Sequence, residues 1–213
     1  LPLHNNYGGI LQAYALQETL KSMGHRPILI DNSGTIKLPI LTKYYRYAVR
    51  TANNILLNSN LTIRYDKEHN YPIKVMRQHT YRFLKKYISR IDLQGSYTLL
   101  KKSRFDAIVV GSDQVWRPRY FWHAPLSDAF LAFAKDWDIK RISYAASFGS
   151  EEWEYTPEQT AECGDLLRRF DAVSVRESSA VSLCKEHFNV DAQHVLDPTM
   201  LLDASHYITL FQQ

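Results

Sequence analysis

The chain has 213 residues, of which 45% are hydrophobic and 23% are charged, and its formal net charge is +4. These proportions are those of an ordinary globular protein and exclude an intrinsically disordered chain. No apolar run approaches the roughly 18 to 20 residues of a membrane-spanning helix, and the sequence does not open like a signal peptide. Cys163 and Cys184 have no Cys or His partner at zinc-ligand spacing. We therefore expect a cytoplasmic protein with small buried cysteines and no metal site.

Five short segments predict buried strands, because they are rich in β-branched residues and apolar on both faces. They are 27–31, 105–110, 141–145, 171–175 and 192–196. Their aliphatic side chains are expected to be buried, namely Ile108, Val109, Val110, Val173, Val175 and Val195.

Helical periodicity separates several of these strands. It covers 9–23 with Asn6 as a candidate cap, 162–170 after a capping box that begins at Thr156, and 180–188 with Ser178 or Ser179 as a cap. The alternation of strands and helices predicts the α/β class, with a Rossmann-like, doubly wound parallel sheet.

Three segments depart from this alternation. Residues 39–100 are basic, rich in tyrosine and helical in period, which predicts a helical insertion in the sheet. Leu1-Pro2-Leu3 is typical of the end of a first strand, and 204–213 of the start of a linker or second domain that is cut short. We therefore expect one Rossmann-like domain over 1–203.

The residues that follow each strand form the candidate site, because ligands of open α/β sheets bind outside the carboxyl ends of the strands. His4 is the histidine at this rim and is a candidate for proton transfer. The other candidates are Asn5, Asn6, Tyr7, Gly8 and Gly9 before the first helix; Gly111, Ser112, Asp113, Gln114 and Trp116; Ser147, Phe148 and Gly149; Arg176 and Glu177; and Asp197.

Each of these loops has two interpretations. The Asn-Gly loop either binds an anion at a helix N-terminus or is a strand-to-helix turn, and Asp197 either binds a ligand or ends a strand. Asp113 either acts as a base or accepts a hydrogen bond from a sugar hydroxyl. Trp116 either stacks on a sugar ring or is a half-buried residue of a structural turn. Arg176 either clamps an anion or forms an ion pair with Glu177. The loops lack the glycine spacing of dinucleotide and P-loop sites, which disfavours NAD and ATP.

Five segments in order carry a resemblance to a known family: 5–16 (NNYGGILQAYAL), 105–116 (FDAIVVGSDQVW), 143–149 (SYAASFG), 173–177 (VSVRE) and 195–202 (VLDPTMLL). In these segments the chain resembles the polysaccharide pyruvyl transferases. The resemblance implies the amino-terminal half of a two-domain architecture similar to the glycosyltransferase-B enzymes.

The resemblance also implies a reaction. Members of the family transfer a pyruvyl group from phosphoenolpyruvate, with no further cofactor, to a sugar of a bacterial exopolysaccharide or its lipid-linked precursor, forming a ketal. It implies Asp113 as an acceptor-binding residue or base, Trp116 as the sugar platform, 5–9 as a cleft wall and Arg176 as an anion contact. Most residues that hold the donor are expected in the carboxyl-terminal half, so this chain alone should be inactive.

Two other functions stay open at this point. An enzyme of the same architecture could use a nucleotide-sugar donor, and a non-catalytic relative could organise a glycan-assembly complex. Residues 42–90 carry eleven Lys or Arg against two acidic residues, an excess of nine positive charges. Such a segment can contact an anionic membrane or a lipid phosphate, whereas it matches no motif that reads nucleic acid.

Overall fold

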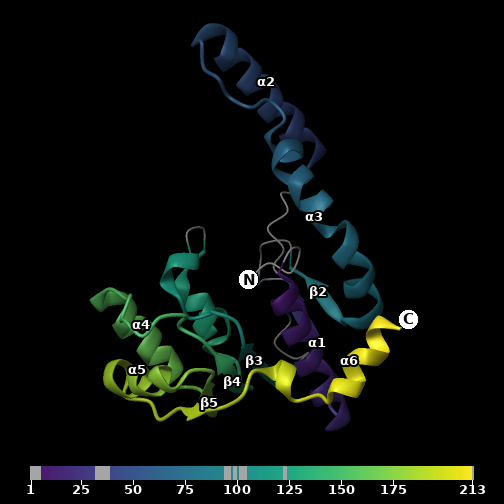
Figure 1. Cartoon of the computed structure of the whole chain (residues 1–213). Coiled ribbons are helices and arrows are strands. Elements are labelled where there is room, and N and C mark those ends of the chain that lie inside the picture. The colour runs from purple at the N-terminus through teal and green to yellow at the C-terminus, as the bar shows by residue number, and fades with distance from the viewer. Residues whose placement is uncertain are drawn as a thin grey trace.

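The computed structural model describes residues 6–31, 39–93, 97, 100, 105–121 and 124–212. His4, Asn5 and the expected tail of a first strand lie outside these residues. The described chain contains two parallel sheets, with helices packed beside them and a long helical arm that extends away from them (Figure 1). The α/β class predicted from the sequence is therefore confirmed.

The larger sheet has four parallel strands in sequential order. They are β3 (Ala107–Gly111), β4 (Lys140–Ala146), β5 (Ala172–Val175) and β6 (Gln193–His194). The bounds of β4 and β5 lie within one residue of the predicted segments, β3 begins two residues later than predicted, and β6 is shorter. Because all four strands are parallel, their carboxyl ends meet at one edge of the sheet.

The smaller sheet contains a strand that the sequence pattern missed. Strand β1 (Leu29–Asp31) pairs in parallel with β2 (Arg90–Asp92), and the Arg90 guanidinium lies 2.7 Å from the Asp31 carboxylate. The expectation that 39–100 is helical throughout is therefore wrong at its end. In the described part of the chain these two strands do not pair with the larger sheet.

The helices begin near their predicted positions. Helix α1 (Tyr7–Ser22) is capped by Asn6, and α4 (Pro157–Leu167) by the capping box of Thr156 and Gln159, as expected. Helix α5 (Ser178–Phe188) has no side-chain cap, so the predicted serine cap is wrong. Ser178 is instead the first residue inside that helix.

Three further helices complete those that the structure describes. Helices α2 (Ile40–Leu56) and α3 (Tyr65–Tyr87) form the arm seen in Figure 1, and α6 (Ala204–Phe211) returns to α1. The hydroxyl of Tyr14 on α1 lies 2.6 Å from Nε2 of His206 on α6. No helix within the described ranges is long and apolar enough to cross a bilayer.

The main core lies between the larger sheet and α4, α5 and the 3₁₀ helix η4 (Leu126–Phe130), and a second cluster joins β3 to the 3₁₀ helix η5 (Ala132–Ala134). Ile108, Val173 and Val175 are buried as predicted. Val109, Val110 and Val195 are only partly buried, contrary to expectation.

Candidate functional site

The loops expected to converge at the carboxyl edge of the larger sheet do so. They follow β3, β4, β5 and β6, and the N-terminus of α1 joins them from a distant part of the sequence. The last loop forms a 3₁₀ turn, η6 (Pro198–Met200), which packs against α1. We call these loops and the N-terminus of α1 the rim, which comprises residues 6–9, 111–116, 147–149, 176–177 and 197–199.

Asp113 links the loop after β3 to the start of α1. Its Oδ2 accepts a hydrogen bond of 2.8 Å from Asn6 Nδ2, and its Oδ1 accepts one of 2.8 Å from the backbone N–H of Gln114. The other side-chain atom of Asn6, Oδ1, accepts from the N–H of Gly9 and so caps α1. One asparagine therefore fixes both the helix end and the carboxylate, which stays partly exposed.

Asp197 is the most heavily hydrogen-bonded carboxylate of the rim. Oδ1 accepts from the backbone N–H and the hydroxyl of Thr199, and Oδ2 accepts from Gln12 and from Arg176. Burial by itself disfavours the charged form of Asp197. The hydrogen bonds from Thr199, Gln12 and Arg176 outweigh burial and hold the pKa of Asp197 below its ordinary value.

Arg176 is occupied by partners within the chain. Its Nη1 donates to the carbonyl of Ser112 at 2.9 Å and lies 3.2 Å from Asp197 Oδ2, while its Nε lies 3.2 Å from Glu177 Oε1. The Ser147 hydroxyl donates to the same glutamate oxygen at 2.6 Å. This geometry favours the interpretation of Arg176 as an ion pair that fixes the loop after β5.

Two glycines allow the rim loops to approach their neighbours closely. A Cβ atom on Gly111 would lie 1.9 Å from the Tyr144 carbonyl oxygen of β4. A Cβ atom on Gly149 would lie 2.4 Å from Oε1 of Gln114, and the φ angle of Gly149 is +66°. A larger residue at Gly111 would clash with the backbone of β4, and one at Gly149 would be strained by the positive φ angle and would displace the Gln114 side chain, so both glycines shape the rim.

The named ionisable side chains of the rim are mostly acidic. Asp113, Glu177 and Asp197 are carboxylates, and Arg176 is a guanidinium that two of these carboxylates already neutralise. A surface of this charge suits neutral hydroxyl groups, which can donate to carboxylates, better than it suits a phosphate.

A sequence model described as polysaccharide pyruvyl transferase matches residues 6–211, nearly the whole chain. The chain belongs to the polysaccharide pyruvyl transferase family. Searches of curated proteins and of solved structures give no significant match. Family membership makes the protein a transferase of the pyruvyl type, with a sugar or polysaccharide as acceptor.

In this pyruvyl transferase the expectation that Trp116 forms a platform for a sugar is wrong. Trp116 is 0% exposed, its ring stacks on Phe130 with centroids 5.2 Å apart, and its indole N–H donates to the carbonyl of Ala129. No face of the ring is free for a pyranose. Ser112, Ser147 and Phe148 are also buried, so these three candidates support the rim loops rather than contact a substrate.

The remaining candidates lie at the surface of the rim. Tyr7 is 65% exposed at the start of α1, Gly8 follows it, and Gln114 is partly exposed beside Arg117. Sequence reasoning missed Gln12 and Thr199, which both hold Asp197. The signal was present in their positions: Gln12 lies in the segment that carries the family resemblance, and Thr199 directly follows Asp197-Pro198.

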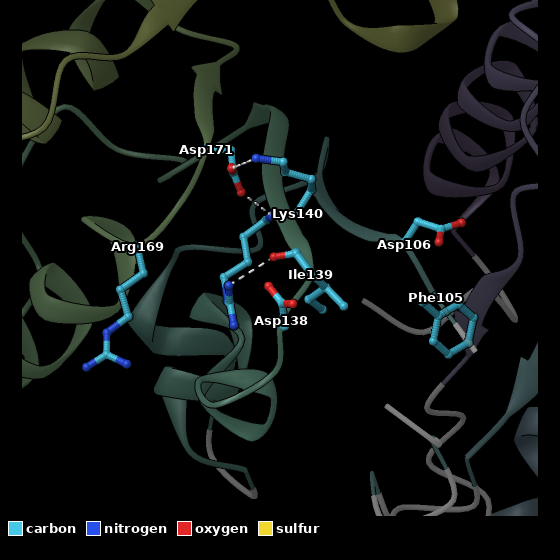
Figure 2. A pocket seen from close by; sticks show the side chains of 8 residues that line it. Phe105, Asp106, Asp138, Ile139, Lys140, Arg169 and Asp171 are labelled. Carbon is cyan, nitrogen blue, oxygen red and sulfur yellow. Dashed lines mark hydrogen bonds and ion pairs between the residues drawn. The ribbon is translucent and has the colours of Figure 1, made fainter. Parts of the chain in front are cut away.

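A pocket of about 420 Å³ lies at the opposite edge of the sheet, between the amino ends of β3, β4 and β5. Figure 2 shows Lys140 paired with Asp171 on one side of it and Asp106 on the other, while the Arg169 side chain points away from that pair. Because ligands of such sheets bind at the carboxyl edge, this pocket is not part of the candidate site. Within the described ranges no group of three metal-ligating side chains is present.

Proposed function

We propose that the chain supplies the acceptor-binding wall of a pyruvyl transferase that uses phosphoenolpyruvate as donor. In this proposal it forms the amino-terminal half of a two-domain, glycosyltransferase-B-like cytoplasmic enzyme with a doubly wound sheet. The observation that supports the proposal is the acidic, hydrogen-bonded rim around Asp113, found in a chain of the polysaccharide pyruvyl transferase family.

Asp113 is the residue best suited to contact the sugar. Each of its carboxylate oxygens accepts one hydrogen bond from the protein. Because an ionised carboxylate has about four lone-pair sites, each oxygen can accept a further bond from a sugar hydroxyl. The Asn6 and Gln114 contacts hold the carboxylate in place before the acceptor arrives, which is how a positioned base or hydroxyl acceptor acts.

The donor is proposed to be held mainly by groups outside the rim. Phosphoenolpyruvate carries a phosphate and a carboxylate and needs cationic partners. Arg176 already has Asp197 and Glu177 as partners, so it adds little free positive charge. The first backbone N–H groups of α1, at Tyr7 and Gly8, are the described groups of the rim best oriented toward an anion.

The reaction sets three requirements on the complete enzyme. A proton must reach the methylene carbon of phosphoenolpyruvate, positive charge must be stabilised at the adjacent carbon as phosphate leaves, and a base must take the proton of the attacking sugar hydroxyl. We assign the last of these roles to Asp113. We assign the other two roles to groups in the proposed carboxyl-terminal half, so residues 1–213 alone should not catalyse the transfer.

The experiment is a transfer assay with the full-length protein, phosphoenolpyruvate and a panel of glycans, read by phosphate release and by the mass of the acceptor. Asp113→Asn should lower kcat about 10²-fold if the carboxylate is the base. Asp191→Asn, which removes an exposed carboxylate just beyond the carboxyl-terminal end of α5, is the matched control. Wild-type kcat in Asp113→Asn, or transfer from a nucleotide-sugar but not from phosphoenolpyruvate, would overturn the proposal.

A further inference from the structure

Helix α2 exposes its apolar side. Seven residues spaced three or four apart form one stripe along the helix, and all seven are exposed. We call them the apolar stripe: Leu41, Tyr44, Tyr45, Ala48, Ala52, Ile55 and Leu56. The five large side chains among them are between 66% and 85% exposed, and the helix contains no buried residue.

The opposite, polar side of α2 makes its contacts with the rest of the chain. The Tyr47 hydroxyl donates to Asp66 at 2.5 Å, and Lys43 lies 3.1 Å from the same carboxylate. Arg50 donates to the carbonyl of Thr62, and Asn54 donates to the carbonyl of Leu61. A helix that packs on a protein core shows the reverse arrangement, with its apolar side inward.

The stripe lies at the far end of the arm. Figure 1 shows α2 beyond the start of α3 and away from both sheets, with the connecting segment 57–64 alongside it. That segment adds further exposed apolar side chains, namely Leu57, Leu61 and Ile63. An apolar helix face that is left exposed in this way marks a contact with another molecule.

The charge of the arm identifies the kind of partner. Residues 40–87 contain ten Lys or Arg against two acidic residues, so the arm is strongly positive. A second copy of the same arm would bring like charges together, whereas an anionic surface complements them. An amphipathic helix with aromatic and leucine side chains on one face and basic residues on the other is typical of helices that lie in the membrane interface.

We propose that α2 docks on an anionic lipid bilayer, with the apolar stripe inserted among the acyl chains at the interface. Tyr44 and Tyr45 lie at the level of the headgroups, where an apolar ring with a polar hydroxyl is favoured. In this arrangement Arg46 on α2 and Arg64 at the start of α3, which are both exposed, face the anionic headgroups. This inference is independent of the proposed transferase chemistry, because binding is measured without substrate.

The test is co-sedimentation of the chain with vesicles of phosphatidylcholine alone or mixed with phosphatidylglycerol. We expect binding only to the anionic vesicles at about 0.1 M salt and release at about 1 M, where the Debye length falls to about 3 Å. The variant Leu41→Gln/Ile55→Gln/Leu56→Gln should bind at least about tenfold more weakly, because three exposed apolar side chains no longer enter the interface. Far-UV circular dichroism checks that this variant keeps its helix content.

Two charge variants locate the contact. Arg46→Ser/Arg64→Ser should weaken binding roughly 30-fold, since each basic residue contributes about 1 kcal/mol near anionic lipid and 1.4 kcal/mol is tenfold. Arg82→Ser/Lys85→Ser removes the same charge from the other end of α3, about 27 Å from Arg64 along the helix, and should weaken binding less. Equal loss in both variants would overturn the placement of the contact on α2.

A second measurement reads insertion directly. Leu56→Cys labelled with an environment-sensitive fluorophore should shift to the blue on anionic vesicles, and the buried Cys163 and Cys184 leave that label specific. Three results would overturn the proposal: no binding at low salt, equal binding to neutral and anionic vesicles, or an unshifted probe. A dimer in solution that the glutamine variant abolishes, without vesicle binding, would instead assign the stripe to a second copy of the chain.

Discussion

Replacing Asp197 by asparagine keeps the shape of the side chain and removes its charge and one acceptor oxygen. Oδ1 accepts two hydrogen bonds from Thr199, and Oδ2 accepts from Gln12 and Arg176. An asparagine has a single oxygen, so in either orientation its NH₂ group faces donors. The variant therefore breaks the link between α1, the loop after β5 and η6.

The magnitude follows from the number and kind of bonds lost. A hydrogen bond to a charged group contributes about 1.5 to 3 kcal/mol, and the Asp197 side chain is only 21% exposed, so solvent screens it little. We expect a loss of about 3 kcal/mol, which is about 9 °C in melting temperature for a chain of this length. Asp191→Asn removes an 89% exposed carboxylate, and this control should melt within about 2 °C of the wild type.

The effect of pH on the same pair of proteins has a definite sign. Because the folded-state pKa of Asp197 is lowered, its stabilisation is complete above its unfolded pKa and is lost as the pH falls through the folded value. The gap in melting temperature between wild type and Asp197→Asn should therefore be full at about pH 7 and narrow below about pH 4. Circular-dichroism melts of the chain at several pH values measure this gap. A difference in melting temperature under about 2 °C at neutral pH, or one that widens in acid, would contradict a stabilising role for the Asp197 carboxylate.

Three further perturbations test the core beneath the rim. Burial raises the pKa of Cys163 and of Cys184 to about 12, so neither thiol should react with a thiol reagent at about pH 8 until the chain unfolds; rapid labelling of the native protein would contradict this. Gly111→Ala should destabilise the chain by more than about 2 kcal/mol in thermal melts, because the new Cβ meets the backbone of β4. Gly8→Ala, whose Cβ has an ordinary 3.5 Å contact, is the control and should leave the melting temperature unchanged. Trp116→Ala should cost about 3 to 5 kcal/mol as a core truncation; unchanged melting, with Tyr120→Ala as the exposed aromatic control, would return Trp116 to the surface.

The sequence predicted the larger sheet well because its strands are apolar on both faces and separated by clear helix signals. It did not predict β2, because Arg90–Asp92 offers one aliphatic side chain between two charged ones. That strand is specified by its partner: Arg90 pairs with Asp31 across the sheet, a contact between residues 59 positions apart. Periodicity within a short segment carries no information about such a pairing.

The candidate rim was predicted in outline for a topological reason. The carboxyl ends of parallel strands share an edge, so Asp113, Arg176 and Asp197 could be grouped before their contacts were known. The role of Trp116 could not be predicted, because the ring is covered by Phe130, from a 3₁₀ segment with no strong sequence period. The helical period of α2 likewise predicts a helix but does not show which side of that helix packs against the rest of the chain, because packing depends on residues distant in sequence.

The central claim is that this rim binds the sugar acceptor and not the anionic donor. Isothermal titration of the full-length protein with acceptor and, separately, with phosphoenolpyruvate tests it most directly, in the wild type and in Asn6→Ala/Asp113→Ala. For the double variant we expect at least about tenfold weaker acceptor binding, which corresponds to about 1.4 kcal/mol, with the dissociation constant for phosphoenolpyruvate changed less than about twofold. Weakened binding of phosphoenolpyruvate with unchanged binding of the acceptor would contradict it.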